Sequence, residues 1–233
     1  MICKKLSVVM LAMIAIPSLA QEAPVYSNYF YNPLSYNPAY AGSRGALSFL
    51  FLHRSQWTGF KGAPSTNTVV MHTPIPKYDI GVGLSIVQDE VGPIKRTGSF
   101  ADFSYQLKLN DKTELSLGLK AGVNNYNSDF NSLYVNDRDD IIFGQEIDNQ
   151  MLFNLGSGLY LNHERYFLSF SIPRIINNKI SDQEVNGHGL CSEQRTLFFS
   201  GGYLHKIHPG LLFQPTALMR VTSGVPPSLD LNA

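Results

Sequence analysis

The chain has 233 residues, with 18 basic and 18 acidic side chains and a formal net charge of zero. Charged residues make up 15% of the chain and aromatic residues 12%. This charge balance gives no electrostatic support to nucleic-acid binding. The composition suits a protein whose outer surface contacts lipid, with tyrosine and phenylalanine available at the membrane interfaces.

Residues 1–20 have the pattern of a secretory signal peptide. Lys4 and Lys5 form a basic region, residues 6–16 are apolar, and a Ser-Leu-Ala run at 18–20 supplies the small residues of a cleavage site. Loss of this segment removes Cys3, so Cys191 is the only mature cysteine and no intrachain disulfide is expected. No later segment offers the roughly 20 apolar residues of a spanning helix. Any membrane-embedded part must therefore be β-structure.

Residues 21–45 are expected to form a periplasmic plug or cap ahead of the first strand. The segment is rich in tyrosine and contains two Asn-Pro pairs, at 32–33 and 37–38. These pairs favour turns, because proline forces the preceding residue out of the helical region.

Residues 46–233 are expected to form one β domain. The predicted strands cover 46–53, 66–73, 79–88, 97–109, 114–124, 151–162, 166–172, 196–206, 211–222 and a tenth from Ser228. Residues 99–124 carry the clearest alternation, with Ala101, Phe103, Tyr105, Leu107, Leu109, Leu115, Leu117, Leu119, Ala121 and Val123 on one face. These runs approach the roughly 9–11 residues of a tilted membrane strand and exceed the about 5–6 of soluble sheets. We predict an all-β fold, a transmembrane antiparallel up-and-down β-barrel of an outer membrane.

Connection lengths alternate along the predicted strands. Short connections fall at 74–78, 110–113, 163–165 and 207–210, and longer ones at 54–65, 89–96, 125–150 and 173–195. Outer-membrane barrels have short periplasmic turns and longer extracellular loops. A periplasmic N-terminus places every short turn on the periplasmic side, and we expect the loops 125–150 and 173–195 to carry partner specificity.

The other face of the predicted strands is expected to line a barrel interior. Its charged residues are Asp102, Lys108, Glu114, Lys120 and Arg220. Small inward neighbours, Gly98, Gly118 and Gly122, leave room for a packed segment. A plugged barrel is therefore favoured over an open porin, in which the same charges would tune ion preference.

The chain stops at Ala233, inside the tenth predicted strand. An unclosed sheet leaves unpaired backbone groups in hydrocarbon, each at a cost of several kcal/mol. We expect either that C-terminal strands are missing from this sequence or that another chain completes the wall.

Residues capable of metal binding or catalysis do not form a convincing site. His205 and His208 have a zinc-like spacing, but strand residues three apart point to opposite sides. The acidic run at 137–140 is expected to be an extracellular loop tip, with a bound calcium ion as the lesser alternative. A barrel hydrolase would need a histidine beside a serine on the lipid-facing wall. The only candidates for such a pair are His72 with Ser85 or Thr68. We predict no enzyme activity, cofactor or metal site.

Trp57 is the only tryptophan. It follows a predicted strand, which favours an anchor at the outer membrane interface over a partner-binding hot spot.

Several spaced motifs follow one another along nearly the whole mature chain. They include an Asn-Pro-Ala-Tyr-Ala-Gly run, a Trp-Thr-Gly-Phe-Lys-Gly-Ala-Pro run and further segments at 81–86 with 92–93, 136–140, 170–173 and 223–233. The motif positions singled out are Asn37, Pro38, Ala39, Tyr40, Gly42, Trp57, Gly59, Gly62 and Pro64. Together these motifs resemble the PorP/SprF family of type IX secretion system membrane proteins.

The resemblance implies an outer-membrane β-barrel that assists type IX secretion in Bacteroidota, supporting adhesin secretion or gliding motility. It also implies three kinds of partner: outer-membrane lipid, secreted cargo with a C-terminal sorting domain, and periplasmic or lipoprotein components of the secretion machine. Family members are typically longer, in agreement with missing strands. A small-solute porin and an outer-membrane hydrolase stay open as alternatives.

Overall fold

A computed structural model describes residues 29–129, 147–178, 184–185, 188–189 and 193–233. Ten of its strands form one antiparallel sheet in the order β1-β2-β3-β4-β5-β6-β7-β10-β13-β14. Their bounds are β1 Ser48–Ser55, β2 Ser65–Ile75, β3 Ile80–Val91, β4 Ile94–Asn110, β5 Thr113–Ser128, β6 Ile147–His163, β7 Tyr166–Ile172, β10 Thr196–Tyr203, β13 Thr216–Thr222 and β14 Ser228–Asn232. The predicted up-and-down antiparallel β architecture is confirmed. The sheet is not closed, because β1 and β14 form its two edges.

The remaining elements are short. Three 3-10 helices cover Pro33–Ser35 (η1), Pro38–Tyr40 (η2) and Pro76–Tyr78 (η3), and two small hairpins pair β8 Glu184–Val185 with β9 His188–Gly189 and β11 His205–His208 with β12 Leu211–Phe213. In the described part of the chain, no helix has the length and apolar character needed to cross a membrane.

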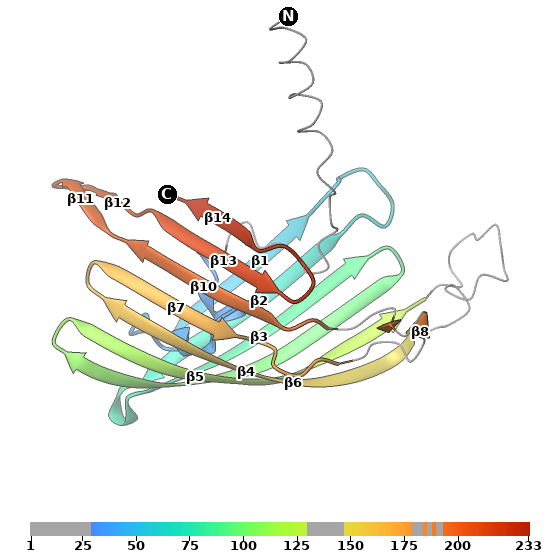
Figure 1. The fold of residues 1–233 in the computed structure, drawn as a ribbon, viewed down its shortest axis with the longest axis horizontal. Coiled ribbons are helices and arrows are strands. Elements are labelled where there is room, and N and C mark those ends of the chain that lie inside the picture. The colour runs from blue at the N-terminus through green and yellow to red at the C-terminus, as the bar shows by residue number, and fades with distance from the viewer. Residues whose placement is uncertain (1–28, 130–146, 179–183, 186–187, 190–192) are drawn as a thin grey trace, which may run out of the picture.

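Strongly curved strands give the sheet a concave side, and its short turns lie together at one end (Figure 1). Strands β4, β5 and β6 have 17, 16 and 17 residues, which makes them longer than predicted. The expected longer connection at 89–96 is wrong, because β3 and β4 continue to a tight turn at Gly92-Pro93. Gly92 adopts φ +58 there, a left-handed conformation that glycine accepts without a Cβ clash.

Two predicted strands, 196–206 and 211–222, are interrupted. Leu204 separates β10 from β11, and Gln214-Pro215 separates β12 from β13. Pro215 has no N–H to donate to a ladder, which explains why the regular pairing stops there. Its carbonyl oxygen still accepts a 3.1 Å hydrogen bond from the Tyr203 N–H, so the two interruptions lie opposite each other.

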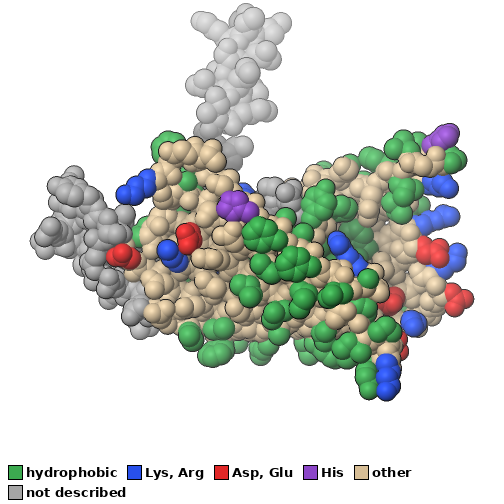
Figure 2. All heavy atoms as spheres, turned by 180° about the vertical axis from the view of Figure 1, so that it is seen from behind, with side chains coloured by type: hydrophobic (Ala, Val, Ile, Leu, Met, Phe, Trp, Pro, Cys, Tyr) green, Lys and Arg blue, Asp and Glu red, His purple; other side chains and the backbone are tan. Residues whose placement is uncertain are grey.

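The two faces of the sheet carry opposite kinds of side chain. In β3, Leu84 and Ile86 are 46% and 41% exposed, whereas Ser85 between them is 2% exposed. The same inversion runs through the sheet, with exposed outward residues that include Phe49, Phe51, Met71, Phe103, Leu117, Leu119, Phe153, Leu155, Leu168, Phe199 and Met219. Figure 2 shows apolar side chains gathered over the middle of one face of the molecule, with charged side chains mostly towards its ends. Apolar outside and polar inside is the arrangement of a membrane β-barrel wall.

Four exposed tyrosines, Tyr78, Tyr105, Tyr166 and Tyr203, mark the short-turn end of this apolar surface. Tyr203 lies opposite Tyr166 in the β10–β7 register, and Tyr105 lies opposite Ile80, two residues from Tyr78. Tyrosine concentrates at membrane–water interfaces because its ring is apolar and its hydroxyl is polar. These residues therefore indicate the interfacial region at the short-turn end of the sheet.

A charged side chain on the outer face should lower the free energy of unfolding most at the middle of the apolar band. Leu119, in the centre of the apolar run of β5, is 63% exposed, and Leu109, at the end of β4, is 57% exposed. Leu119→Arg should lower the free energy of unfolding by about 2–4 kcal/mol and Leu109→Arg by only about 0–1 kcal/mol, because the penalty depends on depth. Denaturant unfolding of the full chain in phospholipid vesicles measures both. Equal small effects would contradict a lipid-facing surface.

Candidate functional site

Residues 29–43, called the inner segment here, lie on the concave side of the sheet. Its polar contacts reach from Asp230 in β14, whose carbonyl oxygen accepts from the Tyr29 hydroxyl, to His72 in β2, whose Nδ1 accepts from the Gly42 N–H. Tyr29, Leu34, Asn37 and Ala39 are buried. The segment therefore fills the space that the sheet curves around.

Local sequence shapes the inner segment. Each Asn-Pro pair starts a 3-10 turn, η1 at Pro33 and η2 at Pro38. The Asn37 side chain caps η2, since its Oδ1 accepts a 2.9 Å hydrogen bond from the Ala39 N–H. Proline suits the first helical position because its missing N–H would be unsatisfied there in any case.

One row of small residues supports this segment. Gly81, Ser104, Gly118, Gly158 and Ser171 lie on the adjacent strands β3 to β7. Each is the register partner of the next, so together they form a continuous transverse row, called the small-residue belt here. Sheet register thus places five residues without bulky side chains side by side.

The belt allows the backbone of the inner segment to touch the sheet. A Cβ atom added at Gly118 would overlap the Ala39 nitrogen, and one added at Gly81 would overlap the Ala41 carbonyl oxygen. The two serines of the belt donate hydrogen bonds instead, Ser104 Oγ to the Ala41 carbonyl at 2.7 Å and Ser171 Oγ to the Tyr36 carbonyl at 2.6 Å. Glycine supplies the close approach and serine satisfies the carbonyl groups.

Asn37 uses both ends of its amide at this contact. Its Nδ2 donates to the Leu159 carbonyl at 2.9 Å and to Ser169 Oγ at 2.7 Å, and its Oδ1 caps η2. A Cβ on Gly158 would overlap that Oδ1. Asn37 is fully buried, and a buried amide is tolerated only when its donors and acceptors are satisfied.

A buried ion pair joins the inner segment to the next row of the sheet. Lys120 Nζ lies 2.7 Å from Asp102 Oδ1, and both side chains are almost completely buried. The same ammonium donates to the Leu34 carbonyl at 3.3 Å and lies 5.3 Å from the centre of the Phe100 ring. An isolated buried charge is costly, so this pairing keeps both groups tolerable inside the sheet.

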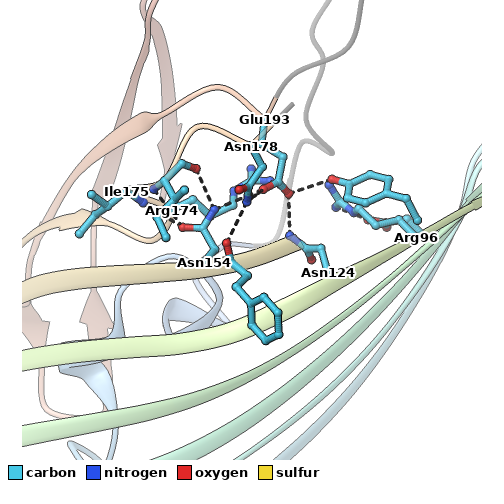
Figure 3. Close-up of polar contacts among 11 residues, drawn as sticks. Arg96, Asn124, Asn154, Arg174, Ile175, Asn178 and Glu193 are labelled. Atoms are coloured by element: carbon cyan, nitrogen blue, oxygen red, sulfur yellow. Dashed lines mark hydrogen bonds and ion pairs between the residues drawn. The ribbon is translucent and has the colours of Figure 1, made fainter. Parts of the chain in front are cut away.

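A second polar cluster lies on the same side of the sheet and surrounds Glu193, from the connection that follows β7 (Figure 3). Its Oε1 accepts from Asn124 at 2.6 Å and from the Tyr126 hydroxyl at 2.8 Å. Its Oε2 accepts from Asn154 at 3.2 Å and from Asn178 at 3.1 Å. Strands β5 and β6 therefore hold the C-terminal end of this connection.

The N-terminal end of the same connection is fixed to β6. Asn154 Oδ1 accepts from the backbone N–H groups of Ile175 and Ile176, and its Nδ2 also donates to the Ile176 carbonyl. A Cβ on Gly156 would overlap the Pro173 carbonyl. Both ends of the connection are therefore packed against the inner wall.

Hydrogen bonding controls the protonation of Glu193. Burial raises the pKa of its carboxyl, but the hydrogen bond from Asn178, the Arg174 charge and the bonds from Tyr126 and Asn154 outweigh it and hold the pKa below its ordinary value. Arg174 Nη1 is 3.5 Å from Glu193 Oε1. The group is thus a carboxylate at neutral pH, held by neutral donors and one cation.

A cavity of about 270 Å³ remains between the inner segment and the Glu193 cluster. Aromatic rings of Tyr29, Tyr36, Phe100 and Phe198 line it together with four cationic side chains, those of Arg96, Lys120, Arg174 and Arg220. Each cation has a carboxylate partner, which is Asp89, Asp102, Glu193 and Asp230 respectively. The wall of the cavity is therefore charge-balanced.

Structure separates the predicted motif positions into two groups. Asn37, Pro38, Ala39, Tyr40 and Gly42 belong to the inner segment described above. Trp57, Gly59, Gly62 and Pro64 lie in the β1–β2 connection, where Gln56 N–H bonds the Pro64 carbonyl and Gly92 N–H bonds the Gly62 carbonyl. Trp57 is 72% exposed. No single site brings the two groups together, and their functional role stays a prediction.

The predicted interior charges differ in how deeply they are buried. Asp102, Lys120 and Arg220 face the concave side. Lys108 lies on the same face of β4 as Asp102 but at the end of the strand, where its side chain is 73% exposed and pairs with Asp79. Glu114 lies opposite Lys108 in the register. Gly118 makes room for the inner segment as expected, whereas the Phe100 ring lies over Gly98 and Gly122.

Residues considered for catalysis or metal binding do not form a site in the described structure. His72, Ser85 and Thr68 are all buried on the concave side, so they do not meet the requirement of a lipid-facing hydrolase pair. His205 and His208 lie in the exposed β11–β12 hairpin. Among the described residues, no three histidine, cysteine or acidic side chains group as metal ligands. Cys191 and the acidic run at 137–140 lie outside the described residues.

The sheet has apolar side chains on its outer face and a filled, polar concave side, which is the arrangement of a membrane β-barrel wall. The family model described as type IX secretion system membrane protein PorP/SprF matches residues 18–233, and the chain belongs to this family. It is thus a membrane component of type IX secretion. A search of curated proteins and a search of solved structures each found no match.

Adding one side chain to the small-residue belt should disrupt its contact with the inner segment. Gly118→Val should displace the backbone at Ala39 and lower the free energy of unfolding by about 1–3 kcal/mol, the usual cost of overpacking. Ala121→Val, on the exposed face of the same strand, serves as the matched control and should be near neutral. Limited proteolysis of the folded protein should cut residues 29–43 faster in Gly118→Val alone. Equal protection in both variants would contradict the contact.

Acid is expected to release the connection held by Glu193. Because the folded-state pKa of Glu193 lies below its ordinary value of 4.5, its stabilisation is present above about pH 4.5 and is lost as pH falls through the folded pKa. Glu193→Gln should remove this part of the pH dependence. Unfolding of both proteins between pH 7 and pH 3 tests this, and identical pH profiles would contradict the role of the carboxylate.

Proposed function

We propose that the chain is an outer-membrane component of the type IX secretion system that docks secreted surface cargo and anchors periplasmic partners. The cargo class is proteins with a C-terminal sorting domain, and the partners are periplasmic or lipoprotein parts of the secretion machine. Adhesin secretion or gliding motility in Bacteroidota is the process it serves. Membership of the PorP/SprF family supports the system, and the filled interior supports a docking role.

The observation that carries the proposal is the occupied concave side. Backbone carbonyls at Tyr36 and Ala41 are hydrogen-bonded to the belt, and the Lys120–Asp102 pair joins the inner segment to the row beside it. The cavity beside the inner segment has a volume of only about 270 Å³, which is far smaller than a folded domain. We infer that the inner segment, within the domain 21–45, acts as a plug and that the wall 46–233 acts as a platform.

The connection after β7 supports a loop-based docking surface. Its two ends are fixed by the Asn154 and Glu193 contacts, so they form a rigid base for the connection. Loops on rigid scaffolds commonly carry recognition. The connection 125–150, most of which lies outside the described residues, is the second proposed recognition loop.

The location proposed is the outer membrane, with the short turns in the periplasm. The two longest connections, between β5 and β6 and between β7 and β10, leave the sheet at the end opposite to the short turns after β2, β4 and β6. This arrangement and the outward apolar band support the assignment. A signal peptide at 1–20, which lies outside the described residues, would direct the chain across the inner membrane.

Two measurements on the purified full chain separate docking from a porin role. In planar bilayers we expect no large, steady conductance, and in vesicles we expect saturable binding of a purified cargo sorting domain. Large conductance without cargo binding would contradict the proposal in favour of a porin. Turnover of phospholipid by the purified protein would instead support the hydrolase alternative.

A matched pair of variants tests the rigid base of the loop. Asn154→Leu removes the contacts to Ile175, Ile176 and Glu193, and it should weaken sorting-domain binding about tenfold, which corresponds to ~1.4 kcal/mol. Asn162→Leu, on the same face of β6 but near the short-turn end, should leave binding unchanged. Equal affinities of the two variants would contradict recognition through this loop.

A further inference from the structure

The β11–β12 hairpin extends further along the strand direction than the β6–β7 turn beside it. Tyr203 in β10 lies opposite Tyr166 in β7, and the neighbouring turn reverses at Glu164-Arg165, only two residues beyond Tyr166. The β11–β12 hairpin instead reverses at Pro209-Gly210, six residues beyond Tyr203. At about 3.3 Å per strand residue, its tip extends roughly 13 Å further than the neighbouring turn. Figure 1 shows the hairpin at the short-turn end of the sheet.

The surface of this hairpin is apolar on both sides. Ile207, Leu211, Leu212 and Phe213 are 57%, 55%, 59% and 44% exposed. Leu212 lies opposite Lys206, and Phe213 lies opposite His205, so consecutive residues of β12 place apolar side chains on the two faces. Large apolar side chains gathered at a protruding tip are a feature of interaction sites in soluble surroundings.

The other three short connections at this end carry charges instead. They present Lys77 and Asp79 after β2, Asp111 and Lys112 after β4, and Glu164 and Arg165 after β6. Each contains both signs of charge, and Lys112 pairs with Glu164 at 3.4 Å. The hairpin from 205 to 213 contains His205, Lys206 and His208 and no acidic residue. Charge and apolar exposure therefore set it apart.

We propose that the β11–β12 hairpin is the docking element for a periplasmic protein that offers an apolar cleft with acidic side chains at its rim. Phe213, Leu212 and Leu211 are the apolar anchors, and Lys206 supplies the complementary charge. A cleft matches the observation that both faces are apolar, since a flat partner covers only one. This inference rests on the proposed function, because it places the short turns in the periplasm.

Lipid is the less fitting occupant. In the adjacent strands β7 and β10, Tyr166 and Tyr203 lie at the short-turn end of the apolar band, and the hairpin starts beyond Tyr203. Its tip passes the charged Glu164-Arg165 turn, which belongs in water. The apolar side chains of the hairpin thus extend past the region that the bilayer covers.

The experiment uses the full chain in lipid nanodiscs. The probes are the purified periplasmic and lipoprotein components of the type IX machine of the same organism, each added singly, and separately vesicles of phosphatidylglycerol and phosphatidylethanolamine. The test variants are Leu212→Ser with Phe213→Ser, and Lys206→Glu. Lys112→Ser in the β4–β5 turn is the control, and unchanged circular dichroism and denaturant midpoints show that every variant is folded.

We expect wild-type protein to bind one of the protein components, the double variant to bind it at least about tenfold more weakly, and Lys206→Glu to bind it more weakly with a smaller dependence on salt. Lys112→Ser should bind as wild type does. Equal binding by the double variant overturns the hairpin proposal and leaves the proposed function intact. Reduced vesicle binding with unchanged protein binding overturns it in favour of a lipid anchor. Wild-type protein that binds no component overturns both proposals.

Discussion

The structure depends on the close approach of a backbone segment to one row of small residues. A membrane β-wall turns its apolar side chains outward, which leaves a polar concave side whose groups need partners. In this chain the belt of Gly81, Ser104, Gly118, Gly158 and Ser171 meets that need, because it brings serine hydroxyls to the carbonyls of residues 29–43. Larger side chains in the row would separate the two surfaces and leave carbonyl groups unsatisfied.

Two further layers build on this contact. One row towards the long connections, the Asp102–Lys120 pair ties strands β4 and β5 to the Leu34 carbonyl. Beyond it, Glu193 gathers donors from β5, β6 and its own connection. Polar contacts thus continue from the inner segment through the interior to the connection that follows β7. They hold the two ends of this connection in place. A docking protein is expected to have a rigid interior that positions exposed loops, and the loops bind the partner.

The sequence predicts the strands well because alternation is a local property. The period of two at 99–124 identified β4 and β5, and the inversion of apolar and polar faces is confirmed at Leu84, Ser85 and Ile86. Gly118 was expected to make room for a packed segment, and Ala39 lies against it. Pro215 cannot donate to a ladder and so indicates the interruption, but the apolar pattern of the sequence predicts a continuous strand over 211–222.

The interior could not be predicted in the same way, because it depends on register between distant strands. Asn37 bonds Leu159 across 122 positions, and Asn124 bonds Glu193 across 69. No local period indicates that five small residues on five strands share one row, or that an acidic residue in a connection returns to the inner wall. The Asn-Pro-Ala-Tyr-Ala-Gly motif pointed to the right segment, but its contacts required the three-dimensional arrangement.

Single nitroxide labels placed in turn at residues 115, 117, 119, 121 and 123 of β5, in a Cys3→Ser, Cys191→Ser background in lipid vesicles, test the central claim most directly. The account predicts that at all five positions the label collides often with oxygen, which concentrates in the bilayer, and rarely with a water-soluble nickel complex. Frequent collision with the nickel complex at these positions would mean that lipid does not contact this face.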